Sequence, residues 1–446
     1  MKPEPQLAAH RSFSRTAAAT YGTNLAAAVL SLANVIITAR LLGPAGRGSV
    51  TFLTTTAMLA ANLAVFGIHE ANANIGGSEP HHRPALATNS VVVSLVFGFA
   101  AGIVVVALFE MFPSLHDQFG MAEVLLMLAA IPVLILQSAL QWLVQSQYRF
   151  AATNIAWFLP PVANVALNGV FAMAGELSVQ SVVAVWVGGQ LLATLLLAWY
   201  TARISRFGAP NLRLAIRSLK FGAGTHLGRV MTVGNYRLDQ WFVGIISGAR
   251  ELGLYSVAVA WAEGLFYLPT ALGQVQRPDL VRASKSEAGR RTASVTRVGM
   301  FVTAVLTVAL LIAAPFLCVT VFGEDFRRSV PELRILALGG FGVGVLKLLG
   351  NALNAHGRPM LTNVGVGVAF VATVGLDLLI VPLYGGMGAA IASTIAYSAG
   401  GVAIAIVFCR TLATRPSDLL PRGTEMRPLV QEFRAWMRRG VTSAVR

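Results

Sequence analysis

The sequence is dominated by uncharged apolar stretches, each long enough to cross a bilayer. A hydrocarbon core about 30 Å thick requires roughly 20 apolar residues in a helix. Six stretches precede a basic segment, at residues 16–39, 48–68, 84–109, 124–148, 150–175 and 177–202. The stretches that follow it are 221–249, 252–275, 298–323, 335–355 and 359–409, the last of which is divided by a turn near Pro382. We therefore predict an all-α integral membrane protein with twelve transmembrane helices.

The amount and placement of charge support this class. Only 12% of the residues are charged, too few to cover a soluble protein of 446 residues. In a soluble protein a net charge of +15 would indicate binding to nucleic acid. Here the basic residues lie between apolar stretches, where they indicate membrane topology and contacts with lipid headgroups. With the N-terminus in the cytoplasm, 25 of the 34 Lys and Arg residues fall on that side and 6 outside. We predict both termini in the cytoplasm, an inner-membrane location, contacts with membrane lipids and no nucleic acid.

An internal repeat divides the chain into halves. Gly43 and Gly48 recur as Gly248 and Gly253, at an offset of 205 residues. We predict two six-helix bundles in parallel topology around a central cavity, the arrangement of many transporters. The predicted parts are an N-tail (1–15), a first bundle (16–202), a basic linker (203–220), a second bundle (221–409) and a basic tail (410–446) with an amphipathic helix.

Ionisable residues inside spans are functional candidates because a charge in hydrocarbon is costly. The six clear ones all lie in the second half: Arg229, Arg237, Asp239, Glu263, Lys347 and Asp377. Arg229 and Lys347, with Arg237 as a third cation, could bind a pyrophosphate. Alternatively, Arg237 pairs with Asp239 or Glu263, and Lys347 pairs with Asp377. Asp239, Glu263 and Asp377 are also candidates for binding a coupling proton or sodium ion.

Uncharged polar residues in the spans of the first half could line a path for sugars. The main candidates are Asn24, Asn34, Gln141 and Asn164. Hydrogen bonds between helices are the alternative role for such residues.

A metal site is not expected. Glu79, His81 and His82 cluster in one loop, but adjacent loop histidines are more often solvated than bound to metal. We predict no metal, no cofactor and no catalytic residue.

Several short segments carry a family resemblance. They are ARLLGPAGRG at 39–48, NYRLD at 235–239, GLYSVA at 253–258, NAHGRP at 354–359 and IVPLYGGMGAA at 380–390. Their order and spacing resemble the polysaccharide (O-antigen) repeat-unit flippases of the multidrug/oligosaccharidyl-lipid/polysaccharide (MOP) exporter superfamily. The resemblance covers roughly residues 15–410. Asp377 departs from it, because Asn is expected there in many relatives.

The resemblance implies two six-helix bundles that work by alternating access. It also implies a polyprenyl-pyrophosphate-linked oligosaccharide, moved from the cytoplasmic to the outer leaflet for surface-polysaccharide assembly. The polymerase and glycosyltransferases of such a pathway are then expected partners.

Other classes fit the sequence less well. A cation-coupled drug antiporter of the same superfamily would carry a carboxylate in the spans of the first half, and those spans contain none. A membrane enzyme would need a large polar loop or a paired-carboxylate motif, and the inner loops are short and basic. A scaffold that has lost transport would not need the embedded charges.

Overall fold

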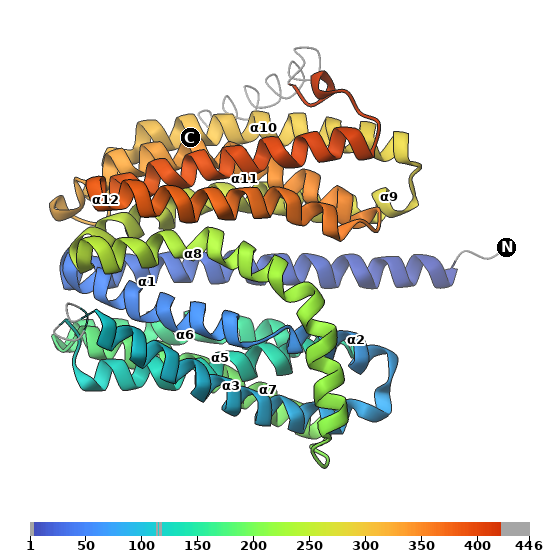
Figure 1. Cartoon of the computed structure of the whole chain (residues 1–446), viewed down its shortest axis with the longest axis horizontal. Coiled ribbons are helices and arrows are strands. Elements are labelled where there is room, and N and C mark those ends of the chain that lie inside the picture. Colours follow the sequence, from blue (N-terminus) through green and yellow to red (C-terminus); the bar gives the residue numbers. More distant parts are fainter. Residues whose placement is uncertain (1–3, 113–114, 116–117, 421–446) are drawn as a thin grey trace, which may run out of the picture. The chain divides into compact units, whose positions relative to one another are not determined.

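The chain is helical in the computed structural model, which describes residues 4–112, 115 and 118–420; no strand occurs among them (Figure 1). The helices of the first half are α1 (Glu4–Ala64), α2 (Ile68–Ser78), α3 (Arg83–Met111), α5 (Met121–Gln145), α6 (Phe150–Ala174), α7 (Val179–Ile204) and α8 (Leu212–Ala262). They are followed by α9 (Tyr267–Arg282), α10 (Lys285–Pro315), α11 (Ser329–Ala355) and α12 (Pro359–Thr411). Short turns complete the chain: η1 (Pro80–His82), η2 (Glu263–Phe266), η3 (Phe316–Thr320), η4 (Glu324–Phe326) and η5 (Pro416–Asp418).

Nine helical segments in the described ranges are long and apolar enough to cross a membrane. Three of these segments contain a glycine with positive φ: Gly43 in α1 (66°), Gly248 in α8 (84°) and Gly385 in α12 (56°). Such a residue ends one helix and allows the next to begin. Figure 1 shows α1 and α12 turning back on themselves. Each of the three segments therefore holds two spans, and the prediction of twelve spans is confirmed.

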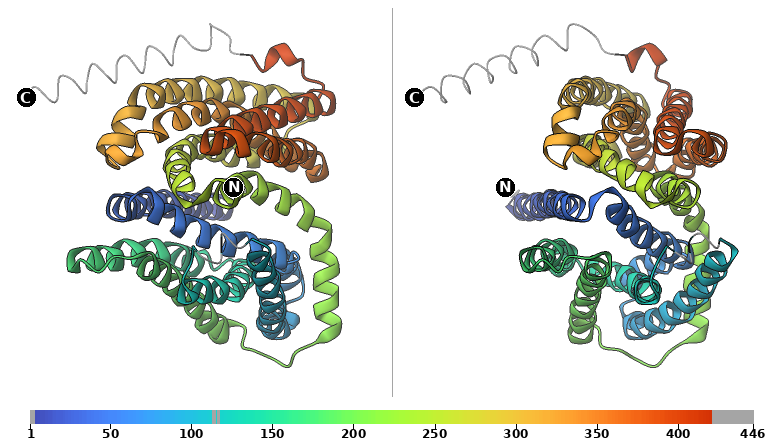
Figure 2. Two further views of the ribbon diagram at one scale, coloured as in Figure 1. Left: turned by 60° about the vertical axis from the view of Figure 1, so that its left-hand side comes forward. Right: turned by 90° about the vertical axis from the view of Figure 1, so that its left-hand side faces the viewer.

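The helices group into two compact units. Unit 1 comprises Met1–Ser256 with Val321–Asp325, and unit 2 comprises Val257–Thr320 with Phe326–Arg446. In unit 1, α1 packs on α6 and α5, and α7 packs on α5 and α6; in unit 2, α11 packs on α12, α10 and α9. Within each unit many helices are seen nearly end-on in the right view of Figure 2. Unit 1 extends to Ser256 and so includes most of α8, whereas the predicted first bundle ends at residue 202, before the linker. The boundaries drawn from the repeat stay a prediction.

The two halves of the repeat touch through equivalent glycines. Gly48 and Gly253 follow the turns of α1 and α8 at matching positions. A Cβ atom on Gly48 would overlap the carbonyl oxygen of Ala249, and one on Gly253 would overlap the carbonyl oxygen of Pro44. The two chain reversals can approach this closely only because both positions lack a side chain.

The predicted linker is partly helical, because α8 begins at Leu212. Figure 1 shows that the first turns of α8 cross unit 1 before the helix bends to run along it. Thr88 Oγ1 donates to the carbonyl of Gly208 (2.7 Å), and Asn89 Nδ2 donates to that of Asn211 (2.9 Å). These bonds attach the linker to the start of α3.

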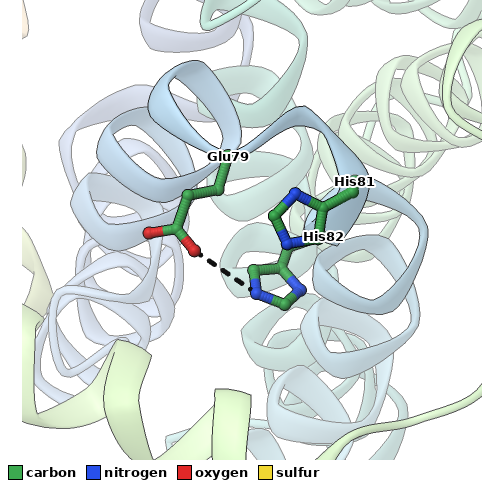
Figure 3. A group of neighbouring side chains, drawn as sticks. All are labelled: Glu79, His81 and His82. Atoms are coloured by element: carbon green, nitrogen blue, oxygen red, sulfur yellow. Dashed lines mark ion pairs between the residues drawn. The ribbon is translucent and has the colours of Figure 1, made fainter.

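An ion pair also fixes the first turns of α8. Arg217 donates to both carboxylate oxygens of Glu79, at 2.9 and 2.5 Å. His82 Nε2 lies 3.3 Å from the same carboxylate (Figure 3). The guanidinium of Arg217, through its hydrogen bonds, holds the pKa of Glu79 below its ordinary value of 4.5.

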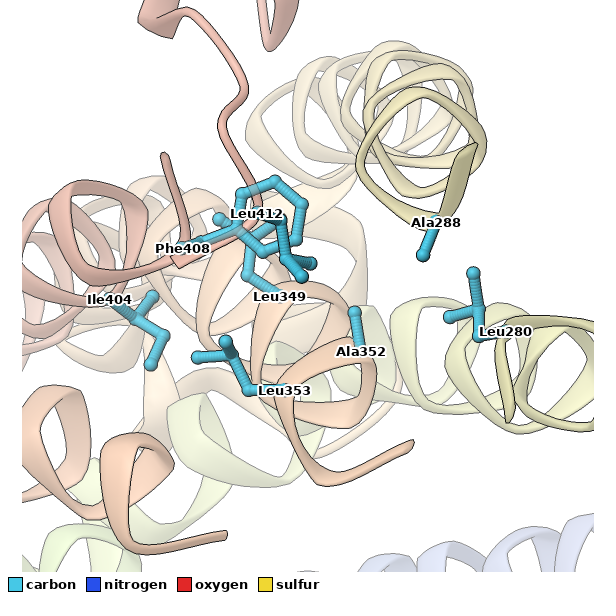
Figure 4. Close-up of a cluster of buried hydrophobic side chains, with 8 residues drawn as sticks. All are labelled: Leu280, Ala288, Leu349, Ala352, Leu353, Ile404, Phe408 and Leu412. Atoms are coloured by element: carbon cyan, nitrogen blue, oxygen red, sulfur yellow. The ribbon is translucent and has the colours of Figure 1, made fainter. Parts of the chain in front are cut away.

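One hydrophobic cluster of unit 2 lies at one end of α9, α10, α11 and α12. Figure 4 shows its fully buried side chains: Leu280, Ala288, Leu349, Ala352, Leu353, Ile404, Phe408 and Leu412. Arg297 on α10 is also buried, and it donates to the carbonyl of Asp418 in η5. These contacts hold the chain that follows α12 against the unit. The amphipathic helix predicted in the tail lies outside the described residues.

We expect Gly48→Ala to destabilise the protein, because its Cβ forces the two reversals apart. Overpacking of this kind costs roughly 1–3 kcal/mol. The measurement is the midpoint of thermal unfolding in detergent. The control is Gly188→Ala on α7, where a Cβ meets nothing within 4 Å. Equal midpoints for Gly48→Ala and Gly188→Ala would contradict the close approach.

We expect the ion pair of Glu79 to stabilise the fold only above acidic pH. A carboxyl whose folded-state pKa is depressed stabilises above its unfolded value and loses this effect as the pH falls through the folded value. The melting temperature of wild type should therefore exceed that of Glu79→Gln at pH 7, and the difference should shrink below pH 4.5. The control is Glu176→Gln, which removes an exposed carboxylate elsewhere in the same unit.

Candidate functional site

One face of α8 carries four residues at helical spacing: Gly222, Thr225, His226 and Arg229. This face lies against the segment that joins α1 to α2. Gly67 in that segment has φ 67°, and a Cβ atom on Gly67 or on Gly222 would overlap the backbone of the other. The contact between the two backbones brings the next two turns of α8 onto the end of α1 and the start of α2.

Three polar contacts follow from this approach. His226 Nε2 lies 3.1 Å from the carbonyl oxygen of Leu63. Arg229 Nε donates to Asn62 Oδ1 at 3.3 Å. Thr225 Oγ1 donates to Glu70 Oε2. We name this group the Arg229 cluster; its members are Asn62, His69, Glu70, Thr225, His226 and Arg229.

Arg229 makes no contact ion pair with any residue that the structure describes. Among the described residues, its single hydrogen bond is the one from Nε to Asn62, and no carboxylate oxygen lies within 4.0 Å of its nitrogens. Glu70 is near enough for its charge to act on Arg229 without contact. The two Nη groups of the planar guanidinium therefore remain available for an acceptor that binds through two oxygens, such as a phosphate.

His69 is the most enclosed member of the cluster. Its side chain is 0% exposed, and neither ring nitrogen has a hydrogen-bond partner in the described structure. The ring meets Trp142 edge-on at 5.4 Å, and its Nε2 lies 3.8 Å from Glu70 Oε1. α2 lies outside the candidate spans. Burial lowers the pKa of His69 to about 3, so the imidazole is neutral at physiological pH.

Glu70 is influenced in two opposing ways. Burial raises the pKa of its carboxyl, and the positive charge of Arg229 lowers it. Burial is the larger effect, so the pKa of Glu70 lies above its ordinary value. This carboxyl therefore takes up a proton more readily than an exposed glutamate does.

The other predicted cations lie in different surroundings. Arg237 Nη1 donates to the carbonyl of Tyr236 at 3.1 Å. Lys347 lies on α11 in unit 2, where the charge of Glu263 acts on it. Arg229 and Lys347 thus belong to different units, and their joint binding of a pyrophosphate stays a prediction.

Two of the three carboxylates predicted for coupling or ion pairing, Asp239 and Asp377, are buried, and Glu263 is partly exposed. Asp239 is 2% exposed, accepts a hydrogen bond from Tyr255 Oη at 2.6 Å, and accepts another from the backbone N–H of Gln240 at 2.7 Å. Asp377 on α12 is 0% exposed. Burying a carboxylate is costly unless it is hydrogen-bonded or paired.

The repeat relates these carboxylates to amides. Asp239 lies 205 residues after Asn34. Asp377 lies 209 residues after Asn168, which is also the offset that relates Arg149 to Arg358 and Asn154 to Asn363 later in the repeat. Asn168 Nδ2 donates to Asn34 Oδ1 at 2.7 Å, between α6 and α1. The positions of a hydrogen-bonded amide pair in the first half are therefore occupied by two carboxylates in the second.

The four residues predicted to line a path for sugars lie in different surroundings. Asn34 takes part in the helix-to-helix bond just described, which is the alternative role weighed for it. Asn24 is exposed, and Gln141 is partly exposed. Asn164 has a buried Oδ1 with no hydrogen-bond partner in the described structure. A role of these residues in binding sugars stays a prediction.

The loop of Glu79, His81 and His82 brings three potential ligand atoms within 4.8 Å of one another (Figure 3). Both oxygens of Glu79 already accept hydrogen bonds from Arg217. A guanidinium in this position competes with a metal ion for the same oxygens, so the residues fit a metal site poorly.

Sequence reasoning identified Arg229 but missed the residues around it. Asn62, His69 and Glu70 lie at the end of the second predicted span, where polar residues are ordinary. The signal that could have found the α8 side of the cluster is the spacing of Thr225, His226 and Arg229. Their partners on α1 and α2 became evident only from the fold.

Comparisons with solved structures show the fold. The lipid II flippase MurJ in an inward closed conformation matches with 14% identity and a TM-score of 0.73, over 87% of this chain and 86% of that one. A multidrug resistance MATE transporter of the MOP superfamily in an inward-facing conformation matches with 16% identity and a TM-score of 0.68, over 88% and 95%. A MOP superfamily transporter from Pyrococcus furiosus matches with 16% identity and a TM-score of 0.58, over 91% and 95%.

Sequence comparison identifies the family. No curated protein matches the chain significantly. A family model described as "Polysaccharide biosynthesis protein" matches residues 37–331, more than half of the chain. The solved structures confirm the predicted fold class, and the family model confirms the predicted relation to polysaccharide biosynthesis proteins. The chain belongs to the polysaccharide biosynthesis protein family, and it has the fold of the MOP superfamily transporters.

Proposed function

We propose that this protein is a flippase for a polyprenyl-pyrophosphate-linked oligosaccharide, which it moves from the cytoplasmic to the outer leaflet by alternating access. The observation that carries the proposal is the guanidinium of Arg229, whose Nη groups have no acceptor among the described residues. A flippase must bring an anionic headgroup past hydrocarbon, and a fixed cation lowers the energy of that group inside the protein. The family match and the MurJ-like fold support the same class of substrate.

The predicted orientation of the protein supports a cytoplasmic position for Arg229. The excess of Lys and Arg on one side of the spans predicts that both termini and the linker lie in the cytoplasm. Arg229 follows this linker in the chain. It contacts Asn62, which lies at the C-terminal end of α1, whereas Gly43 lies at the other end of the same span. The headgroup would therefore meet Arg229 as it enters from the inner leaflet. Arg237 and Lys347 remain candidates for later contacts along the path.

The carboxylates of the second half and the enzymes of the same pathway have further roles in the proposed function. Asp239, Glu263 and Asp377 would bind the coupling ion or hold ion pairs in the second half. The glycosyltransferases and the polymerase of the same pathway would supply the substrate and consume the product. The alternative is a cation-coupled antiporter of the same superfamily, which the MATE matches represent. The spans of the first half contain no Asp or Glu, and embedded cations repel a cationic drug, so this alternative is the weaker.

We expect the Arg229→Ala variant to restore no polysaccharide output when it is expressed in a strain whose own copy of this gene is deleted, whereas wild type restores it. The variant loses the bidentate donor for the headgroup, together with the hydrogen bond from Nε to Asn62 on α1. The measurement is the surface polysaccharide, with the amount of membrane-inserted protein determined in parallel. The control is Arg213→Ala, which removes an exposed arginine from the same helix.

Normal polysaccharide from an Arg229→Ala strain would remove Arg229 from the mechanism. An antiporter would give a different pattern, in which the polysaccharide is unchanged in the deletion strain and resistance to cationic drugs is lost.

A further inference from the structure

The Arg229 cluster contains the carboxyl group of Glu70, and the proposed role of Arg229 in binding an anion does not explain its presence. Glu70 lies beside a cation whose proposed task is to receive an anion, and an ionised carboxylate there repels the same anion. Its Oε2 accepts a hydrogen bond from Thr225, and its Oε1 faces His69 Nε2 at 3.8 Å. Glu70 thus lies close to Arg229 without occupying its Nη groups.

The charged and titratable groups around Glu70 come from two helices. α8 contributes Arg229 and His226, and α2 contributes His69. α1 contributes Asn62 and the carbonyl of Leu63, and α5 contributes Trp142; neither helix adds a titratable side chain to the contacts of the cluster. From α3, Arg83 donates to the carbonyl of Gly76, near the far end of α2. Arg229 is therefore the fixed charge that most favours ionised Glu70.

His69 provides an acceptor for a proton on Glu70. A neutral imidazole has one nitrogen that donates and one that accepts. Both nitrogens of His69 are buried and lack a hydrogen-bond partner in the described part of the chain, and a buried polar group of this kind is costly. A protonated Glu70 supplies the missing donor, because a shift of about 1 Å brings its O–H into hydrogen-bonding distance of His69 Nε2, 3.8 Å away.

We propose that Glu70 takes up one proton when a pyrophosphate group binds to Arg229, and releases it when that group leaves. This inference rests on the proposed function of Arg229. The bound anion neutralises the guanidinium and adds negative charge beside the carboxylate, and both changes favour the protonated acid. One proton moves from water to a carboxylate oxygen of Glu70, forming an O–H group that donates to His69. The protonated acid no longer repels the headgroup.

The test is calorimetric binding of farnesyl pyrophosphate to the full-length protein in lipid nanodiscs. Titrations in buffers of different ionisation enthalpy give the number of protons taken up per molecule bound. Wild type should take up more protons than Glu70→Gln, by up to about one, because only wild type can protonate this side chain. Accordingly, the affinity of wild type should fall more steeply between pH 6 and pH 8. The Gln variant has the same shape and can still accept the hydrogen bond of Thr225.

Two controls separate the possible failures. Glu79→Gln removes a carboxylate of the same unit that is paired with Arg217, and it should retain the proton uptake of wild type. Arg229→Ala should weaken binding of the probe at least tenfold. Equal proton uptake by wild type and Glu70→Gln, with binding still dependent on Arg229, would overturn this inference alone. Binding unaffected by Arg229→Ala would overturn the proposed function together with it.

Discussion

Every backbone polar group that this chain carries into the hydrocarbon of the bilayer needs a partner within the protein, because hydrocarbon offers none. The backbone meets this constraint by remaining helical almost throughout the described ranges. Three chain reversals are made by single glycines with positive φ, which keep the interruption of backbone hydrogen bonding short. Polar side chains meet the same constraint in pairs, as Asn34 does with Asn168 and Asp239 with Tyr255.

Glycine also decides where helices come closest. Gly48 and Gly253 allow two chain reversals to touch, and Gly67 and Gly222 allow α8 to lie directly on the segment between α1 and α2. The second contact has a chemical consequence. It fixes the register that brings Arg229 to Asn62 and Thr225 to Glu70. A side chain at either position of this contact would separate the cation from the carboxyl group.

The two halves of the chain share a fold but differ in charge. The first half has a hydrogen-bonded pair of amides, Asn34 and Asn168, and the second half has carboxylates at the equivalent positions 239 and 377. Arg229 belongs by sequence to the second half, yet it lies in the compact unit that contains the first six spans. Its neighbours therefore come from the half of the chain that has no embedded charge of its own. The resulting cluster combines a cation from one repeat with a carboxyl group and a histidine from the other.

The sequence by itself determined the class, the number of spans and the repeat. These depend on composition, length and glycine placement, which act locally or as sums along the chain, as Gly43 and Gly248 show. It also singled out Arg229, because a charge within an apolar stretch is visible without a fold. Only the tertiary structure decided what surrounds Arg229. Asn62 and Glu70 are about 160 residues from their partners on α8 and follow no pattern in the sequence. Their contact depends on the path of the backbone at Gly67 and Gly222, which is a property of packing in three dimensions.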